Sequence, residues 1–132
     1  MFKNFFKAGS SSLSEFERAV LARVSQALPP EEEQKLRNRI ESVNLVQRLD
    51  GGREVNCYVM HGGSPVFPEE TRLDFSKGER LLAKLTITGP LGTANSGSVW
   101  LINGNFFALE FRSPTEHANA NSITDIQVDI CD

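Results

Sequence analysis

The sequence is poor in the residue types that most often signal a reaction or a cofactor. Its 132 residues include two cysteines, two histidines, one tryptophan and one tyrosine. Two cysteines are too few for the disulfide framework of a small secreted domain, and whether Cys57 and Cys131 pair stays open. His61 and His117 lie far apart in the chain, and no spacing of His, Cys or carboxylate residues matches a metal-binding motif. We therefore expect no metal site and no cofactor.

Long apolar runs and a basic surplus are also missing. No stretch approaches the roughly 20 apolar residues that a membrane-spanning helix requires. Lys3, Asn4 and Lys7 interrupt the apolar N-terminal residues, which is not typical of a secretory signal. The net charge of −3 lacks the positive excess that proteins following a nucleic-acid backbone carry. These features predict a cytoplasmic protein with no nucleic-acid partner and without membrane attachment.

Two short glycine-containing motifs resemble parts of catalytic sites but lack the rest of them. The stretch HGGS at 61–64 resembles the oxyanion loop of lipases, but no G-x-S-x-G nucleophile motif accompanies it. The stretch GTANSGS at 92–98 has glycines spaced as in a phosphate loop, without its lysine and without a following helix. We assign no catalytic residue, and the sequence favours a function other than catalysis.

The first third of the chain has the periodicity of two helices. The apolar residues of 13–28 fall on one helical stripe, and Pro29 ends this pattern. Either Ser12 with Glu15 or Ser14 with Glu17 fits a capping box at its start. Residues 29–43 form a second helical pattern, with three glutamates in its first turn, where the helix dipole favours anions.

From residue 44 the apolar period changes from 3.6 to 2, which indicates β-strands. Strands are expected at 44–49 and 53–60 around a turn, at 80–88, at 99–111 as a hairpin, and near 122–130, with loops at 62–77 and 89–98. In 80–88, Leu81, Ala83, Leu85 and Ile87 are expected to share the buried face. Helices that precede all strands predict one α+β domain. It consists of a helical part, 1–43, packed on one face of a curved antiparallel sheet of about five to six strands, 44–132.

The stretch WLINGNFFALEF, residues 100–111, predicts a hairpin with a two-residue Asn-Gly turn. A regular register pairs Leu101 with Phe106, Trp100 with Phe107 and Val99 with Ala108. One face then carries Trp100, Ile102, Phe107, Leu109 and Phe111, and the other carries Val99, Leu101, Phe106 and Ala108, with Glu110 toward the open end. Both faces are apolar, so a second layer besides the helices is expected to cover one of them.

Three covers are open: the chain's own loops or its N-terminal aromatic segment, a second copy of the chain, or a different partner. The leading hypothesis is a non-enzymatic protein-interaction module that forms a homodimer through an apolar surface. The candidate interface residues are Phe2, Phe5, Phe6, Trp100, Phe106 and Phe107.

Two alternative functions remain open. The first is a small-molecule binding protein or enzyme with an apolar pocket in the curved sheet, for which Asn56, Tyr58 and His61 are the candidate ligand-binding residues. The second is an acidic inhibitor or immunity-type protein that contacts a basic partner through Asp125 and Asp129 of the last strand.

Overall fold

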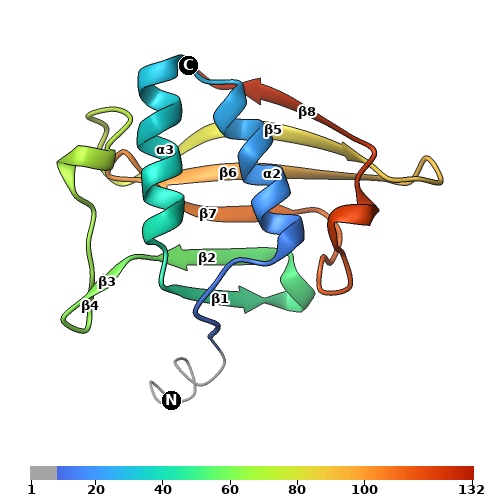
Figure 1. The fold of residues 1–132 in the computed structure, drawn as a ribbon, viewed down its shortest axis with the longest axis horizontal. Helices are drawn as coiled ribbons and strands as arrows, with labels where there is room; N and C mark the ends of the chain where they lie inside the picture. The colour runs from blue at the N-terminus through green and yellow to red at the C-terminus, as the bar shows by residue number, and fades with distance from the viewer. Residues whose placement is uncertain (1–8) are drawn as a thin grey trace.

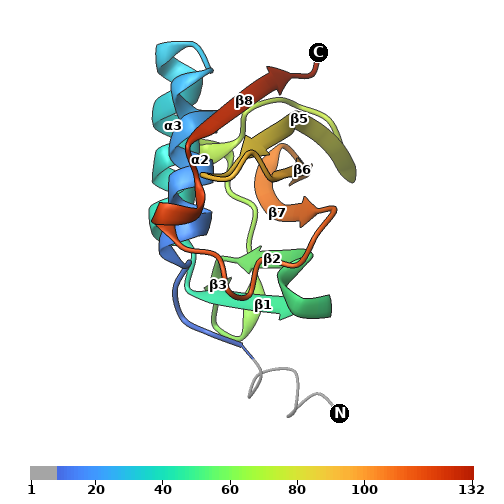
Figure 2. The same ribbon diagram turned by 90° about the vertical axis from the view of Figure 1, so that its right-hand side faces the viewer.

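The structure is a computed structural model that describes residues 9–132. Two helices, α2 (Glu15–Gln26) and α3 (Pro30–Ser42), precede all the strands. The strands of the main sheet are β1 (Leu45–Leu49), β2 (Glu54–Tyr58), β5 (Glu79–Thr88), β6 (Ala94–Ile102), β7 (Asn105–Phe111) and β8 (Asp125–Ile130), and a small hairpin is formed by β3 (Met60–His61) and β4 (Ser64–Pro65). The predicted α+β class is confirmed, with helices layered on one side of a curved antiparallel sheet (Figures 1 and 2).

Local sequence signals explain where the helices begin. Ser14, not Ser12, caps α2: its hydroxyl accepts from the Glu17 N–H at 3.1 Å, and the Glu17 carboxylate accepts from the Ser14 N–H at 2.8 Å. This reciprocal pair satisfies two backbone donors that the first helical turn leaves free. Helix α3 has Pro30 at its first position, where the missing N–H costs nothing.

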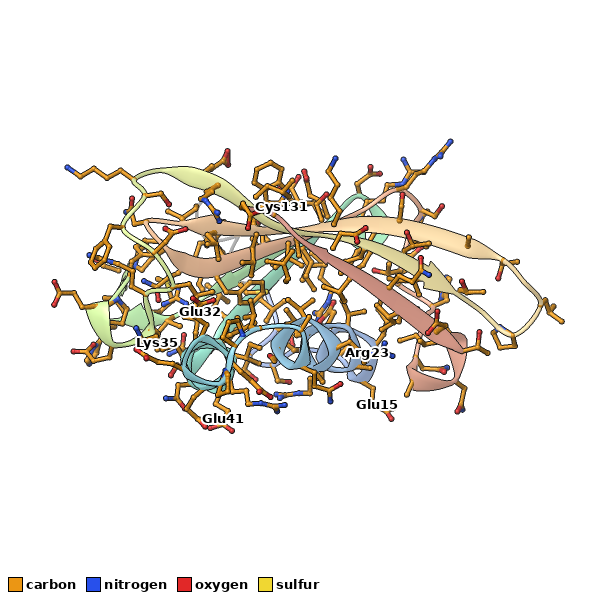
Figure 3. All side chains as sticks on the ribbon, turned by 90° about the horizontal axis from the view of Figure 1, so that it is seen from above. Glu15, Arg23, Glu32, Lys35, Glu41 and Cys131 are labelled. Atoms are coloured by element: carbon orange, nitrogen blue, oxygen red, sulfur yellow. The ribbon has the colours of Figure 1, made fainter. Side chains whose placement is uncertain are left out.

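The six strands lie in the order β1-β2-β7-β6-β5-β8, all antiparallel. Both helices cross the same face of this sheet, as Figures 1 and 2 show. Seen from above in Figure 3, the opposite face carries side chains and has no helix or strand laid over it in the part of the chain that the structure describes. We call this uncovered side the open face.

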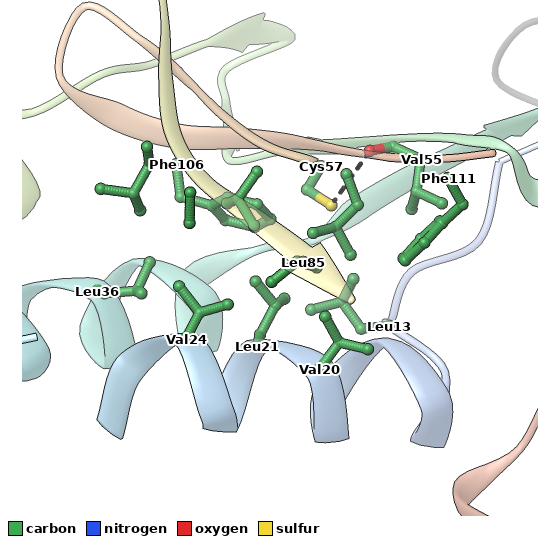
Figure 4. Packing of buried hydrophobic residues seen from close by; sticks show 14 of the residues in the cluster. Leu13, Val20, Leu21, Val24, Leu36, Val55, Cys57, Leu85, Phe106 and Phe111 are labelled. Carbon is green, nitrogen blue, oxygen red and sulfur yellow. Dashed lines mark hydrogen bonds between the residues drawn. The ribbon is translucent and has the colours of Figure 1, made fainter. Parts of the chain in front are cut away.

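The hydrophobic core fills the space between the helices and the sheet. Figure 4 shows Val20, Leu21 and Val24 of α2 pointing toward the sheet, and their exposed fraction is 0%. From the sheet, Val55, Cys57 and other inward side chains meet them. Since a core at crystal-like density excludes water, these contacts supply the main favourable free energy of folding.

Strand β5 differs from its expected alternation at one position. A bulge between Leu81 and Ala83 places Leu82, 4% exposed, in the core, while Leu81 pairs with Trp100 and is only half-buried. The expectation that Leu81 shares the buried face is therefore wrong, because the extra residue reverses the alternation on one side of the bulge. The loop expected at 89–98 is also shorter, since β6 already begins at Ala94.

A second bulge lies in the 100–111 hairpin and answers the question of its two apolar faces. The turn and the first pairs, Ile102 with Asn105 and Leu101 with Phe106, are confirmed, but Trp100 pairs with Ala108 and Val99 with Leu109. Phe107 is the extra residue. The expected pairs of Trp100 with Phe107 and of Val99 with Ala108 are wrong, because a one-residue shift exchanges the faces beyond it.

The shift moves apolar side chains into the core and a polar one out of it. Leu109 and Phe111, expected beside Trp100, are 0% and 5% exposed and pack under the helices, with the Phe111 ring 5.6 Å from that of Phe16. Glu110 takes their place on the open face. The second face of the hairpin is therefore less apolar than a regular register implies.

Candidate functional site

The open face is built from the outward residues of each strand, which stand in cross-strand rows. One row runs Glu54, Glu110, Ser98, Lys84 and Asp129; the next runs Asn56, Ala108, Trp100 and Leu81; a third ends with Ile102 and Glu79. Because neighbours in a row lie about 5 Å apart across the strands, side chains from β2, β7, β6 and β5 form one continuous surface.

A hollow of about 230 Å³ lies in the middle of this surface. Ala108 lies at the centre of the hollow's residues and is 7% exposed. The side chains of Trp100, Ile102 and Phe107 and the carboxylates of Glu54, Glu79 and Glu110 line it, together with Asn56. The hollow exists because a methyl group stands where each neighbour in the row has a longer side chain.

An aromatic series supports one side of the hollow. The Tyr58 and Phe107 rings meet edge to face with centroids 5.1 Å apart, and Phe67 lies 6.4 Å from Phe107. The buried Arg39 guanidinium lies 5.3 Å from the Phe67 centroid and donates hydrogen bonds to the carbonyls of Phe106, at 3.0 Å, and Val66, at 2.8 Å. Desolvation lowers the pKa of Arg39 to about 10. Arg39 therefore stays charged at neutral pH and ties α3 to the segment that holds the aromatic rings.

Two carboxylates stand side by side at the other end of the hollow. Glu54 and Glu110 are directly opposite each other on β2 and β7, an arrangement of like charges that destabilises a sheet. Neighbouring donors orient them: Trp100 Nε1 donates to Glu110 at 2.6 Å, and Asn56 Nδ2 donates to Glu54 at 3.2 Å. Burial and the nearby charge of Glu54 raise the pKa of Tyr58.

No lysine or arginine of residues 9–132 forms an ion pair with Glu54, Glu79 or Glu110. The described side-chain donors to Glu54 and Glu110 are the neutral groups of Asn56 and Trp100.

The other half of the open face carries charges of both signs. A wider depression of about 700 Å³, open to solvent, is lined by Arg53, Lys84 and Arg112 and also by the carboxylates of Asp50, Glu54, Glu110 and Asp129. All three cations are exposed, and within residues 9–132 only Arg53 among them has an ion-pair partner, Asp50 at 3.8 Å. The hollow is therefore acidic and aromatic, whereas the wider depression places three exposed cations among carboxylates.

The structure brings together some of the residues that the sequence singled out. Asn56, Tyr58, Trp100 and Phe107 all lie on the open face, within or beside the hollow. His61 lies on β3 in the separate small hairpin, exposed and paired with Ser64, and does not line the hollow.

Two other sets of interface candidates do not belong to this face. Phe106 is 0% exposed beneath the helices, so it is a core residue and not a surface for a partner (Figure 4). Phe2, Phe5 and Phe6 lie outside the described residues, and the cover proposed for them stays a prediction.

The carboxylates of the hollow are the functional candidates that reasoning from the sequence missed. A regular hairpin register puts Glu110 at the open end of the hairpin, on the face away from Trp100. Glu54 falls within the expected strand 53–60, where the sequence pattern assigns it no role. A signal existed in the pairing of Glu54 with Glu110, but it could be read only with the correct register of β2 on β7.

Elsewhere in the chain, the two cysteines are free and unpaired with each other. Residues 9–132 contain no group of three or more His, Cys, Asp or Glu side chains that could hold a metal ion. Within the same range no helix has the length and apolar character needed to cross a membrane. Comparisons with protein-family models, with curated proteins and with solved structures find no significant match to this chain.

Proposed function

We propose that this chain is a non-enzymatic protein-interaction module, and that it forms a homodimer through the open face of its sheet. The observation that carries the proposal is the composition of that face. One half holds the acidic hollow with Trp100 and Phe107, and the other half holds the exposed cations Arg53, Lys84 and Arg112 among carboxylates. A two-fold axis near Ser98 would bring the cations of one copy toward the acidic hollow of the other.

The size of the face suits this role. Six strands spaced about 4.8 Å apart, each presenting about seven residues at 3.4 Å, give roughly 600 Å² of projected surface before side-chain relief. A specific interface buries about 800 Å² per partner, so the whole face and the relief of its side chains would be used. Trp100 and Phe107 are of the aromatic type that such interfaces are enriched in.

The geometry favours this function over the small-molecule alternative. Pockets that hold small molecules usually enclose about 300–1,000 Å³ and bury most of the ligand. The hollow beside Trp100 is smaller, about 230 Å³, and the larger depression is open to solvent and lined mainly by polar residues. Each suits a side chain of a partner better than an enclosed ligand.

Native mass spectrometry of the purified chain and of three variants tests the proposal. We expect a dimer for the wild type and for Leu91→Glu, because Leu91 lies in the β5–β6 loop and is 92% exposed. Trp100→Glu and Lys84→Glu should be monomeric with an unchanged circular dichroism spectrum. Lys84 is exposed, so its substitution separates loss of the dimer from loss of the fold.

Three results would contradict the proposal. A bare monomer for the wild type would show that the open face does not bind a second copy, and a monomer with unexplained added mass would favour the small-molecule alternative. A dimer that persists in both Trp100→Glu and Lys84→Glu would place the interface elsewhere.

A further inference from the structure

We infer that the hollow between Trp100 and the Glu54–Glu110 pair is a binding site for an organic cation, the guanidinium or ammonium group of an arginine or lysine side chain. This inference rests on the proposed function for the source of the cation, which is one of the exposed residues Arg53, Lys84 and Arg112 of a second copy. The chemistry of the hollow itself stands on separate observations.

The first observation is the unfavourable placement of charge. Glu54 and Glu110 are cross-strand neighbours on β2 and β7, and neither forms an ion pair within residues 9–132, although three cations line the adjoining depression. Like charges in this position destabilise the sheet, and such breaks of a local rule occur at functional sites. A cation seated between the two carboxylates would remove the repulsion and turn it into attraction.

The second observation is the aromatic wall. Trp100 lines the hollow and also donates its Nε1–H to Glu110 at 2.6 Å. The indole ring is the aromatic group that attracts a cation most strongly, and the Phe107 side chain lines the same hollow. A planar guanidinium stacks on aromatic rings and bonds carboxylates through several donors, so arginine fits this combination better than lysine.

The third observation is the space. Ala108 leaves a depression of about 230 Å³, which accommodates the end of one long side chain. A larger residue at this position would fill the site without touching the core. The hollow therefore combines room, aromatic side chains and carboxylates without a direct ion pair at one place on the open face.

Trp100 is the only tryptophan of the chain, so its fluorescence reports directly on the hollow. The probe is n-propylguanidinium, which has the same structure as the end of an arginine side chain. It is titrated into the protein at concentrations too low to denature it. The control is n-propylurea, which has a similar shape and no charge. The proteins are the wild type, Glu54→Gln/Glu110→Gln, and Glu15→Gln/Glu41→Gln. The last pair makes the same change in net charge on the helices, and Figure 3 shows both of its glutamates on the side away from the open face.

We expect a saturable change in Trp100 fluorescence with n-propylguanidinium in the wild type and in the helix variant. In Glu54→Gln/Glu110→Gln the affinity should fall about tenfold or more, since both carboxylates that attract the cation are gone. Added salt should weaken the binding in the wild type, and n-propylurea should give no saturable signal.

Native mass spectrometry at the same protein concentration separates this inference from the proposed function. If the wild type is a dimer, n-propylguanidinium should compete for the hollow and raise the monomer fraction, and Glu54→Gln/Glu110→Gln should weaken the dimer. If the wild type is a monomer, the homodimer fails while the titration still measures the cation site. No saturable response in the wild type, an equal response in the carboxylate variant, or an equal response to n-propylurea each overturns the inference.

Discussion

Replacing Leu109 and Ile102 by alanine, one at a time, tests the β-bulge that shapes the open face. A regular hairpin would put both side chains on the same face with similar surroundings. With Phe107 as an extra residue, Leu109 is 0% exposed in the core and Ile102 is half-buried on the open face. The two substitutions should therefore differ in their effect on the free energy of unfolding.

The expected difference is large enough to measure. Truncating a fully buried leucine to alanine costs about 2–5 kcal/mol, because the buried contacts are lost and a cavity remains in their place. Ile102 already keeps part of its surface in water, so its truncation should cost about 1 kcal/mol. With a urea dependence of about 1–3 kcal/mol per M, the Leu109→Ala midpoint should lie at least about 0.3 M below that of Ile102→Ala.

Urea unfolding followed by circular dichroism measures both free energies. Each variant is studied at two protein concentrations, since stability that comes from a dimer rises with concentration whereas stability from the core does not. An Ile102→Ala loss equal to or larger than the Leu109→Ala loss at the lower concentration would refute the bulge and the face assignment that follows from it.

Two further predictions concern the core side of the sheet. Glu17 is 2% exposed, and its carboxylate accepts hydrogen bonds from Arg48 Nη2 at 2.7 Å, from Arg48 Nε at 2.8 Å and from the Ser14 N–H. Glu17→Ala should therefore lower the free energy of unfolding by about 2–4 kcal/mol. In the same urea assay, Glu15→Ala, at an exposed position, should change the free energy of unfolding by no more than about 0.5 kcal/mol. Burial raises the pKa of the Cys57 thiol above its ordinary value of 9.0, so above that pH the unfolded chain releases a proton that the folded chain keeps. The free energy of unfolding should consequently fall as pH rises above about 9, and the fall should be smaller in Cys57→Ala; an identical slope in both proteins would contradict this prediction.

The order and type of the elements could be predicted because they depend on local patterns. The apolar stripe of residues 13–28 and the proline after it define a helix on their own, as does the Asn103-Gly104 turn for the hairpin. Helices that precede all strands then leave few arrangements besides a helical layer on an antiparallel sheet. These conclusions survive an error of one or two residues in any boundary.

The pairing register of the strands, in contrast, changes completely with an error of one residue. The apolar alternation of NFFALEF does not by itself show that Phe107 is an extra residue, because it fits a start from either phenylalanine equally well. The bulge depends on tertiary contacts: Arg39 of α3 holds the Phe106 carbonyl from one side, and Tyr58 and Phe67 pack against Phe107 from the other. Those partners lie 40 or more residues away in the sequence, so no local rule could place them.

The composition of the candidate site also depends on Phe107 being the extra residue of the bulge. Without the bulge, Leu109 would lie beside Trp100, and Glu110 would point under the helices, where an unpaired carboxylate costs several kcal/mol. The cost of burying Glu110 therefore favours the bulged register over the regular one, because the bulge returns the charge to solvent and brings Leu109 and Phe111 into the core. The same shift places Glu110 opposite Glu54 and within reach of the Trp100 indole. The requirement to keep one carboxylate out of the core thus also creates the acidic and aromatic hollow on the open face.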